Sequence, residues 1–185
     1  MKKIMMSLLL IGISPSCSSD DSNLDTQEII PGEILVGIKS GIDIKEIFDF
    51  INQFELEVDH ITSLSFTSNL PPESLKDVLD NLNKKNYTND GVNWFVNGYL
   101  YAQTNRIWIF PRLFDMHTVD YQQDWLLSMG ELELKDKHNP ELNSGIIQFK
   151  VPEGQENEWE KKFESFDIVD WAELNYVADI ELYKN

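Results

Sequence analysis

The sequence predicts an α+β fold in which two strand-helix-strand halves flank a large insertion. Three observations support this prediction. Residues 30–66 and 145–185 each contain a strand-like apolar run, an amphipathic helical run and a second strand-like run, in that order. Aligning the two halves places Phe50 on Phe163, as in an internal repeat. Residues 67–144 between them keep a regular apolar spacing, which is typical of folded structure and not of a linker.

The first half begins with a half-alternating apolar run over residues 30–39, which predicts a strand. Asp43 and Glu46 then have the spacing of a capping box, in which two side chains satisfy free backbone N–H groups at the start of a helix. A second strand is predicted within residues 56–64. The apolar residues of the helix recur at helical spacing and form one face: Ile44, Ile47, Phe48 and Ile51.

The second half repeats this order near the C-terminus. Residues 145–151 predict a strand, residues 152–154 a turn, and Ile168, Val169 and Trp171 the start of a last strand. The helix between them carries one aromatic stripe: Trp159, Phe163 and Phe166. One such unit alone leaves an apolar sheet face uncovered, so the two halves should pack together. The result is one antiparallel sheet covered by two helices, the ferredoxin-like split β-α-β arrangement.

The insertion opens with a predicted helix. Pro72 suits the first helical position because it has no backbone N–H to leave unsatisfied. Lys84 and Lys85 lie where the negative end of the helix dipole favours cations. The apolar stripe between them has helical spacing: Leu75, Val78, Leu79 and Leu82.

A β-meander should follow this helix. Residues 92–96 predict a strand, and residues 99–103 with 106–110 predict a hairpin. A short helix over residues 118–129 is then expected to stop at Gly130. The insertion is therefore predicted to be a helix plus meander that folds onto the two halves.

Parts of both halves resemble the propeptide domains of subtilisin-like proteases. Residues 30–36, followed by a strand ending in glycine and a helix, resemble the opening of these domains, and residues 171–176 resemble their closing strand. The family usually has proline where this chain has Leu174. The resemblance covers residues 30–62 and 145–183 and leaves the insertion unmatched. It implies a ferredoxin-like domain that chaperones or inhibits a protease.

The resemblance also implies a role for the chain end. In the family, the C-terminal tail lies in the substrate cleft of the protease by strand addition. Here the chain stops soon after the predicted last strand, so the candidate partner-binding residues are Leu182, Tyr183, Lys184 and Asn185. The alternative interpretation is a frayed terminus without a function.

The N-terminus has the parts of a secretory signal peptide. Residues 1–16 contain two lysines, an apolar run too short to span a bilayer, and small residues before Cys17. Residues 10–17 resemble a lipobox, which implies that a lipid such as palmitate is attached to the cysteine. Residues 18–23 resemble the acidic tract of surface lipoproteins of Bacteroidetes-type bacteria. The resemblance implies a lipid-anchored outer-membrane protein that faces the cell exterior.

These motifs predict three segments. Residues 1–16 form a removable signal peptide, residues 17–29 a lipidated acidic tether, and residues 30–185 a single α+β domain. Cys17 is the only cysteine, so it cannot form a disulfide within the chain. The competing interpretation is a small buried apolar residue.

The strong negative charge limits the classes of partner. The formal charge is −17, and removal of the two lysines of the signal peptide takes it to −19. A chain this acidic is repelled by phosphate backbones, so nucleic acid is not an expected partner. The simpler role of the charge is solubility.

No catalytic or metal-binding motif emerges from the sequence. It contains no Gly-x-Ser-x-Gly elbow, His-Glu-x-x-His pair or phosphate-binding glycine loop. The histidines, His60, His117 and His138, are far apart in the sequence, and the nearest acids to His117 are Asp115 and Asp120. We therefore expect a non-enzymatic protein without metal or cofactor.

The aromatic residues of the insertion support a second hypothesis. Trp94, Tyr99, Tyr101 and Trp108 lie close together in the sequence, and exposed Trp and Tyr side chains are commonly used to bind carbohydrate. Against this, residues 106–110 are apolar on both alternating faces, which favours a buried strand. The binding and core interpretations both remain open, with the core favoured.

Overall fold

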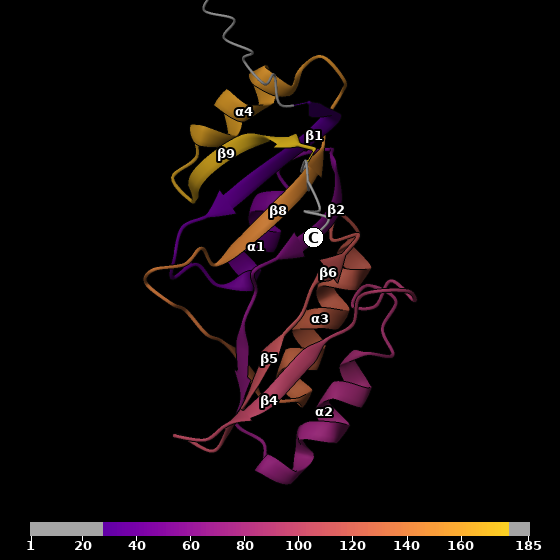
Figure 1. Ribbon diagram of the computed structural model, residues 1–185, viewed down its shortest axis with the longest axis vertical. Helices are drawn as coiled ribbons and strands as arrows, with labels where there is room; N and C mark the ends of the chain where they lie inside the picture. The colour runs from indigo at the N-terminus through magenta and orange to yellow at the C-terminus, as the bar shows by residue number, and fades with distance from the viewer. Residues whose placement is uncertain (1–27, 178–185) are drawn as a thin grey trace, which may run out of the picture.

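The computed structural model describes residues 28–177, so the signal peptide, Cys17, most of the tether and residues 182–185 lie outside the described part. Within that part, the chain forms a mixed α+β fold with two antiparallel sheets and four α-helices. Figure 1 shows the two sheets arranged one after the other along the long axis of the molecule. Each helix within residues 28–177 is too short or too polar to span a lipid bilayer.

The first sheet has the strand order β6-β2-β8-β1-β9. Its strands span β6 Leu113–Phe114, β2 Glu57–Thr62, β8 Gly145–Lys150, β1 Ile29–Ile38 and β9 Val169–Tyr176. The two strands predicted in each half are confirmed. In the centre, Val36 lies opposite Ile147 of β8 on one side and Ala172 of β9 on the other. The two halves are therefore interleaved in one sheet.

Two helices cover the same face of this sheet. They are α1 Ile44–Ile51 and α4 Glu156–Glu164, both predicted from the apolar stripes. Phe163 of α4 stacks on Phe149 of β8 at 4.6 Å between ring centroids, and Phe50 of α1 lies 6.2 Å from each of these rings. Full burial of one such side chain stabilises the fold by about 1.5–3 kcal/mol. The aromatic residues at equivalent positions of the two halves thus meet in one core.

The second sheet has the strand order β4-β5-β3-β7. Its strands span β4 Asn97–Tyr101, β5 Arg106–Phe110, β3 Phe66–Ser68 and β7 Leu134–Asp136. A 3-10 turn, η1 Pro72–Ser74, leads into α2 Leu75–Leu82, and α3 Val119–Glu131 follows β6. Trp125 of α3 is fully buried 5.2 Å from the Phe66 ring. As Figure 1 shows, α2 and α3 lie on one side of this sheet.

The insertion is more than the predicted helix plus meander. β3 begins at the last residue of the first half but pairs with β5 and β7, whereas β6 from the insertion pairs with β2 of the first sheet. The predicted hairpin of β4 and β5 is confirmed. Pairing of strands so far apart in the sequence cannot be inferred from local periodicity.

The predicted strand at residues 92–96 is wrong, because these residues form a loop. The Asp90 carboxylate accepts hydrogen bonds from three successive backbone N–H groups, those of Val92, Asn93 and Trp94, at 2.8–2.9 Å. Such local bonds compete with strand pairing for the same backbone groups. The loop is therefore held by its own acidic residue.

Two predicted helix ends also differ. Asp43 precedes α1, but its side chain does not cap the helix. Instead, the Ile44 N–H donates to Asp136 Oδ1 at 3.0 Å, so a carboxylate from β7 replaces the predicted capping box. Helix α3 continues through Gly130 to Glu131, because a glycine favours but does not enforce a helix end.

Candidate functional site

The first sheet has an open face opposite α1 and α4. Alternation along the strands places Glu33, Leu35, Gln148 and Lys150 on it, with Glu33 opposite Lys150 and Leu35 opposite Gln148. These side chains are partly buried, although no described helix covers them. The open face is therefore a preformed surface made by strands from both halves.

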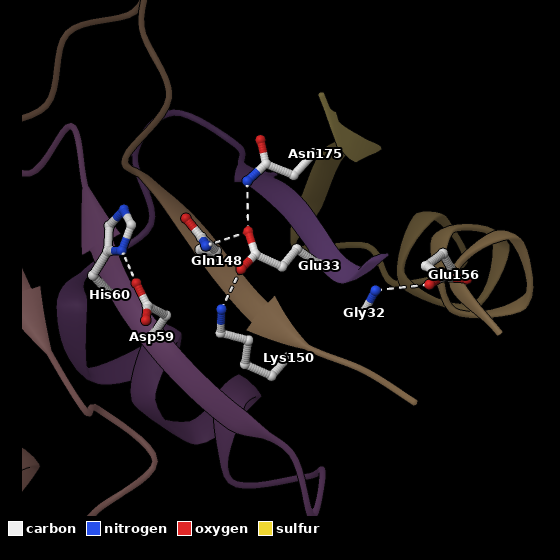
Figure 2. Close-up of polar contacts among 8 residues, drawn as sticks. All are labelled: Gly32, Glu33, Asp59, His60, Gln148, Lys150, Glu156 and Asn175. Atoms are coloured by element: carbon white, nitrogen blue, oxygen red, sulfur yellow. Dashed lines mark hydrogen bonds and ion pairs between the residues drawn. The ribbon is translucent and has the colours of Figure 1, made fainter. Parts of the chain in front are cut away.

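Glu33 is the centre of the polar network on this face (Figure 2). Its carboxylate accepts hydrogen bonds from Gln148 Nε2 and Asn175 Nδ2, each at 2.7 Å, and from Lys150 Nζ. The Glu33 side chain is only 12% exposed, so these donors replace most of its hydration. Because the donors come from β8 and β9 and the acceptor from β1, the network ties three strands together.

His60 and Asp59 of β2 form a second polar pair near this network (Figure 2). His60 Nδ1 lies 2.5 Å from Asp59 Oδ2. Burial of the ring lowers the pKa of His60, and the charge of Arg112 adds to this effect, while the hydrogen bond to Asp59 opposes it. Burial therefore favours the neutral form of the His60 imidazole.

The Lys150 ammonium keeps its charge on the same face. Burial by itself lowers the pKa of Lys150, but the hydrogen bond and charge of Glu33, together with the charges of Asp59 and Glu57, outweigh burial and raise it. The open face thus carries an ion pair beside a partly buried imidazole. In the described residues, Asp59 is the side chain that hydrogen-bonds to His60.

An apolar area adjoins the network on the open face. Trp171 packs across Gly37, where a Cβ atom would lie 2.2 Å from Trp171 Cε2, so only glycine admits the indole ring. The Trp171 Nε1–H donates to Asn143 Oδ1 at 3.2 Å, and Ile146 lies opposite Gly37 on β8. The face therefore combines a flat apolar surface with a hydrogen-bonded polar centre.

The outer face of the second sheet, opposite α2 and α3, carries a row of aromatic side chains. Tyr101 stacks on Trp108 at 4.1 Å between ring centroids, and Tyr99 stacks on Phe110 at 5.6 Å. Tyr99 also lies 5.8 Å from Trp108, so the four rings are in continuous contact. We call Tyr99, Tyr101, Trp108 and Phe110 the aromatic row.

The structure separates the four aromatic residues singled out from the sequence. Tyr99, Tyr101 and Trp108 lie together, whereas Trp94 lies in the preceding loop, where the Arg112 guanidinium is 4.3 Å from the centre of its ring. The expected burial of both faces of residues 106–110 is wrong. Only Ile107 and Ile109 are fully buried, while Trp108 and Phe110 are partly exposed.

A cavity of about 300 Å³ lies between the two sheets, under the segment that joins β7 to β8. Among its lining residues, His138 Nε2 is 3.0 Å from Asp43 Oδ1, and Ser144 Oγ is 3.3 Å from His138 Nδ1. Ser144 Oγ also accepts the Ile42 N–H at 3.1 Å. These contacts fasten the segment before β8 to the start of α1.

Sequence reasoning missed both the Glu33 network and the His138 contacts. The Glu33 network could have been suspected from the polar residues at alternate positions of an otherwise apolar strand, such as Gln148 and Lys150. The His138 contact to Asp43 joins segments far apart in the sequence, and no local sequence pattern predicts it. His117 is exposed, and within residues 28–177 no group of three His, Cys, Asp or Glu side chains is arranged to hold a metal ion.

Comparisons with known proteins add no relative. No protein-family model matches the chain, and neither a curated protein nor a solved structure matches it.

Proposed function

We propose that this protein is an exported, non-enzymatic lipoprotein, anchored in the outer membrane through Cys17 and facing the cell exterior, that binds a protein partner. Its scaffold is ferredoxin-like and similar to a protease propeptide. The strand order β2-β8-β1-β9, with α1 and α4 on one face, supports this assignment because a split β-α-β repeat interleaves its two halves in this way.

The observation that carries the binding proposal is the Glu33 network on the open face of the first sheet. A protein partner needs a rigid surface with few unsatisfied polar groups, and the three hydrogen bonds to Glu33 provide both. Leu35 and Trp171 add apolar area beside it. Protein interfaces combine such an apolar centre with a hydrogen-bonded polar surround.

The first partner to test is a subtilisin-like protease. β9 is an edge strand, and Tyr176 near its end lies opposite Ile29, the first residue of β1. The candidate partner-binding residues, Leu182 to Asn185, follow this edge strand in the sequence. An edge strand is where strand addition to a protease would begin.

The test is inhibition of a panel of subtilisin-like proteases by the full-length chain. We expect inhibition at micromolar concentration or tighter, lost when Leu182 to Asn185 are deleted. The matched control is Lys76→Gln, which removes one partner of the exposed Lys76–Asp80 ion pair. This variant should inhibit fully, because Lys76 lies on α2, away from the open face. Absence of inhibition across the panel contradicts a propeptide-like role.

The lipid anchor has its own test. Replacement of Cys17 by Ser should release the protein from the membrane fraction and abolish palmitate labelling, since the cysteine sulfur is the only thiol in the chain. A variant that stays in the membrane fraction contradicts the anchor and leaves the binding proposal untouched.

A second candidate function is carbohydrate binding by the aromatic row. The observation in its favour is that Tyr99, Tyr101 and Trp108 share an open sheet face and stack on one another. Electrophoresis in gels that contain polysaccharide should show retardation that Tyr99→Ala abolishes. Trp94→Ala is the matched aromatic control, because Trp94 lies outside the row. Equal retardation of both variants and the original chain contradicts this function.

A further inference from the structure

We infer that the outer face of the second sheet binds acidic polysaccharides, those that carry carboxylate or sulfate groups. This inference rests on the second candidate function and names its ligand class. It follows from three cations that share a face with the aromatic row. We call the aromatic row together with Arg106, Lys135 and Lys137 the basic-aromatic face.

Strand register places these cations around the row. Trp108 of β5 lies opposite Thr67 of β3, and Thr67 lies opposite Lys135 of β7. Arg106 lies opposite Tyr101 on the other side. The Lys137 ammonium is 4.1 Å from the centre of the Trp108 ring. The cations therefore flank the rings on the same side of the sheet.

The charge of this face differs from that of the whole chain. Although the protein has 32 acidic and 15 basic residues, the four strands of this sheet contain a single acid, Asp136. Asp136 lies opposite Phe66, on the face covered by helices, and accepts the Ile44 N–H. In the described part of the chain, none of the three cations has an ion-pair partner within 4.0 Å. Their charge is available to a ligand.

The rings favour a sugar chain over a nucleic-acid base. The Tyr101 ring stacks on the Trp108 ring with 4.1 Å between their centroids, and the Lys137 ammonium also lies 4.1 Å from the centre of the Trp108 ring. The stacked Tyr101 ring leaves no room for the ammonium on its own face of Trp108, so the ammonium lies over the opposite face. Both faces of Trp108 are therefore occupied, and a flat base cannot stack there as it does on open aromatic platforms. Tyr99 is 46% exposed and presents apolar area across which the C–H groups of a sugar can pack.

Arg and Lys then provide the specificity for acidic groups. A guanidinium or ammonium donates charge-assisted hydrogen bonds to carboxylate and sulfate oxygens, which a neutral sugar lacks. The rings are already stacked in the free protein, so little conformational freedom is lost when a ligand lies across them. Because the rest of the chain repels anions, binding depends on these local contacts.

The experiment is affinity electrophoresis of the full-length chain in gels that contain polygalacturonate, dextran sulfate, neutral dextran or neutral xylan. We expect retardation by the two acidic polymers only. The triple variant Arg106→Gln, Lys135→Gln, Lys137→Gln should weaken it by about tenfold or more. The matched control is Lys45→Gln, Lys84→Gln, Lys161→Gln, which removes the same charge from exposed sites elsewhere and should change retardation less than about twofold.

Each other outcome overturns the inference in a distinct way. Equal losses in the two triple variants mean that total charge, not this face, controls migration. Equal competition by poly-L-glutamate means a general polyanion surface. If neutral xylan retards the chain and the triple variant is retarded equally, the ligand is not an acidic polysaccharide, although carbohydrate binding still stands. If no gel retards the chain, both the acidic-polysaccharide inference and the carbohydrate-binding function are contradicted. Far-UV circular dichroism confirms that each variant folds.

Discussion

The open faces of the two sheets differ in whether their cationic side chains have acidic partners. On the first sheet, Lys150 is paired with Glu33, and Gln148 and Asn175 complete the coordination of that carboxylate. On the second, Arg106, Lys135 and Lys137 have no acid within ion-pair distance in the described residues. A surface whose charges are satisfied internally is suited to a shape-complementary protein partner, while unpaired cations beside aromatic rings are suited to an anionic ligand.

The largest expected effects test whether the two sheets form one cooperative unit. Phe163→Ala in the first core and Trp125→Ala in the second should each lower the free energy of unfolding by about 3–5 kcal/mol, because both side chains are fully buried. Urea unfolding followed by circular dichroism should show a single transition for each variant. Two separate transitions would mean that the sheets unfold independently.

Gly37→Ala should destabilise the open face of the first sheet by about 1–3 kcal/mol, since the added Cβ collides with the Trp171 indole. The Trp171 hydrogen bond to Asn143 should be lost with it, which an NMR spectrum of the indole N–H would report. Gly130→Ala is the control, because nothing lies near a Cβ at that helical position. An unchanged indole signal in Gly37→Ala contradicts the packing described here.

Glu33→Gln should lower the free energy of unfolding by about 1–3 kcal/mol, because it leaves the partly buried Lys150 without a counter-charge. The contrasting pair is Lys76 with Asp80 on the exposed surface of α2, where Lys76→Gln should change stability by less than about 0.5 kcal/mol. Thermal unfolding in parallel measures both. Equal effects would show that the Glu33 network is no more than a surface ion pair.

The smallest expected effect is a pH dependence due to His60. Because its pKa is lowered on folding, the unfolded chain binds the proton more tightly, and His60 therefore reduces stability as the pH falls below its ordinary value of 6.5. Between pH 7 and pH 5, His60→Gln should lose less stability than the original chain. An identical pH dependence for both would show that His60 is not buried as described.

Sequence periodicity predicted the first sheet better than the second. The helices with Phe50 and Phe163 have complete apolar stripes, and each joins strands adjacent to it in the sequence, so both halves were recognisable. β3 has only three residues, and its partners β5 and β7 lie far along the chain. Such a short strand carries no readable alternation, so the second sheet was predicted only as a meander.

The candidate surfaces were predictable in composition but not in arrangement. The aromatic residues of the row were singled out from the sequence, but their burial was overestimated for Trp108, because residues 106–110 are apolar on both faces. Which face α2 and α3 cover depends on the packing of Trp125 and Phe66. The cations Lys135 and Lys137 joined the row only through the pairing of β7 with β3.

The sequence by itself determined the α+β class, the strand-helix-strand order of both halves and the strongly acidic character of the chain. These properties depend on composition and on neighbours three or four residues apart. Only the tertiary structure decided that Glu33 binds Gln148, Lys150 and Asn175, and that three cations without an ion-pair partner among residues 28–177 share a face with Trp108. These contacts depend on strand register between distant segments, which the packing of the whole core selects.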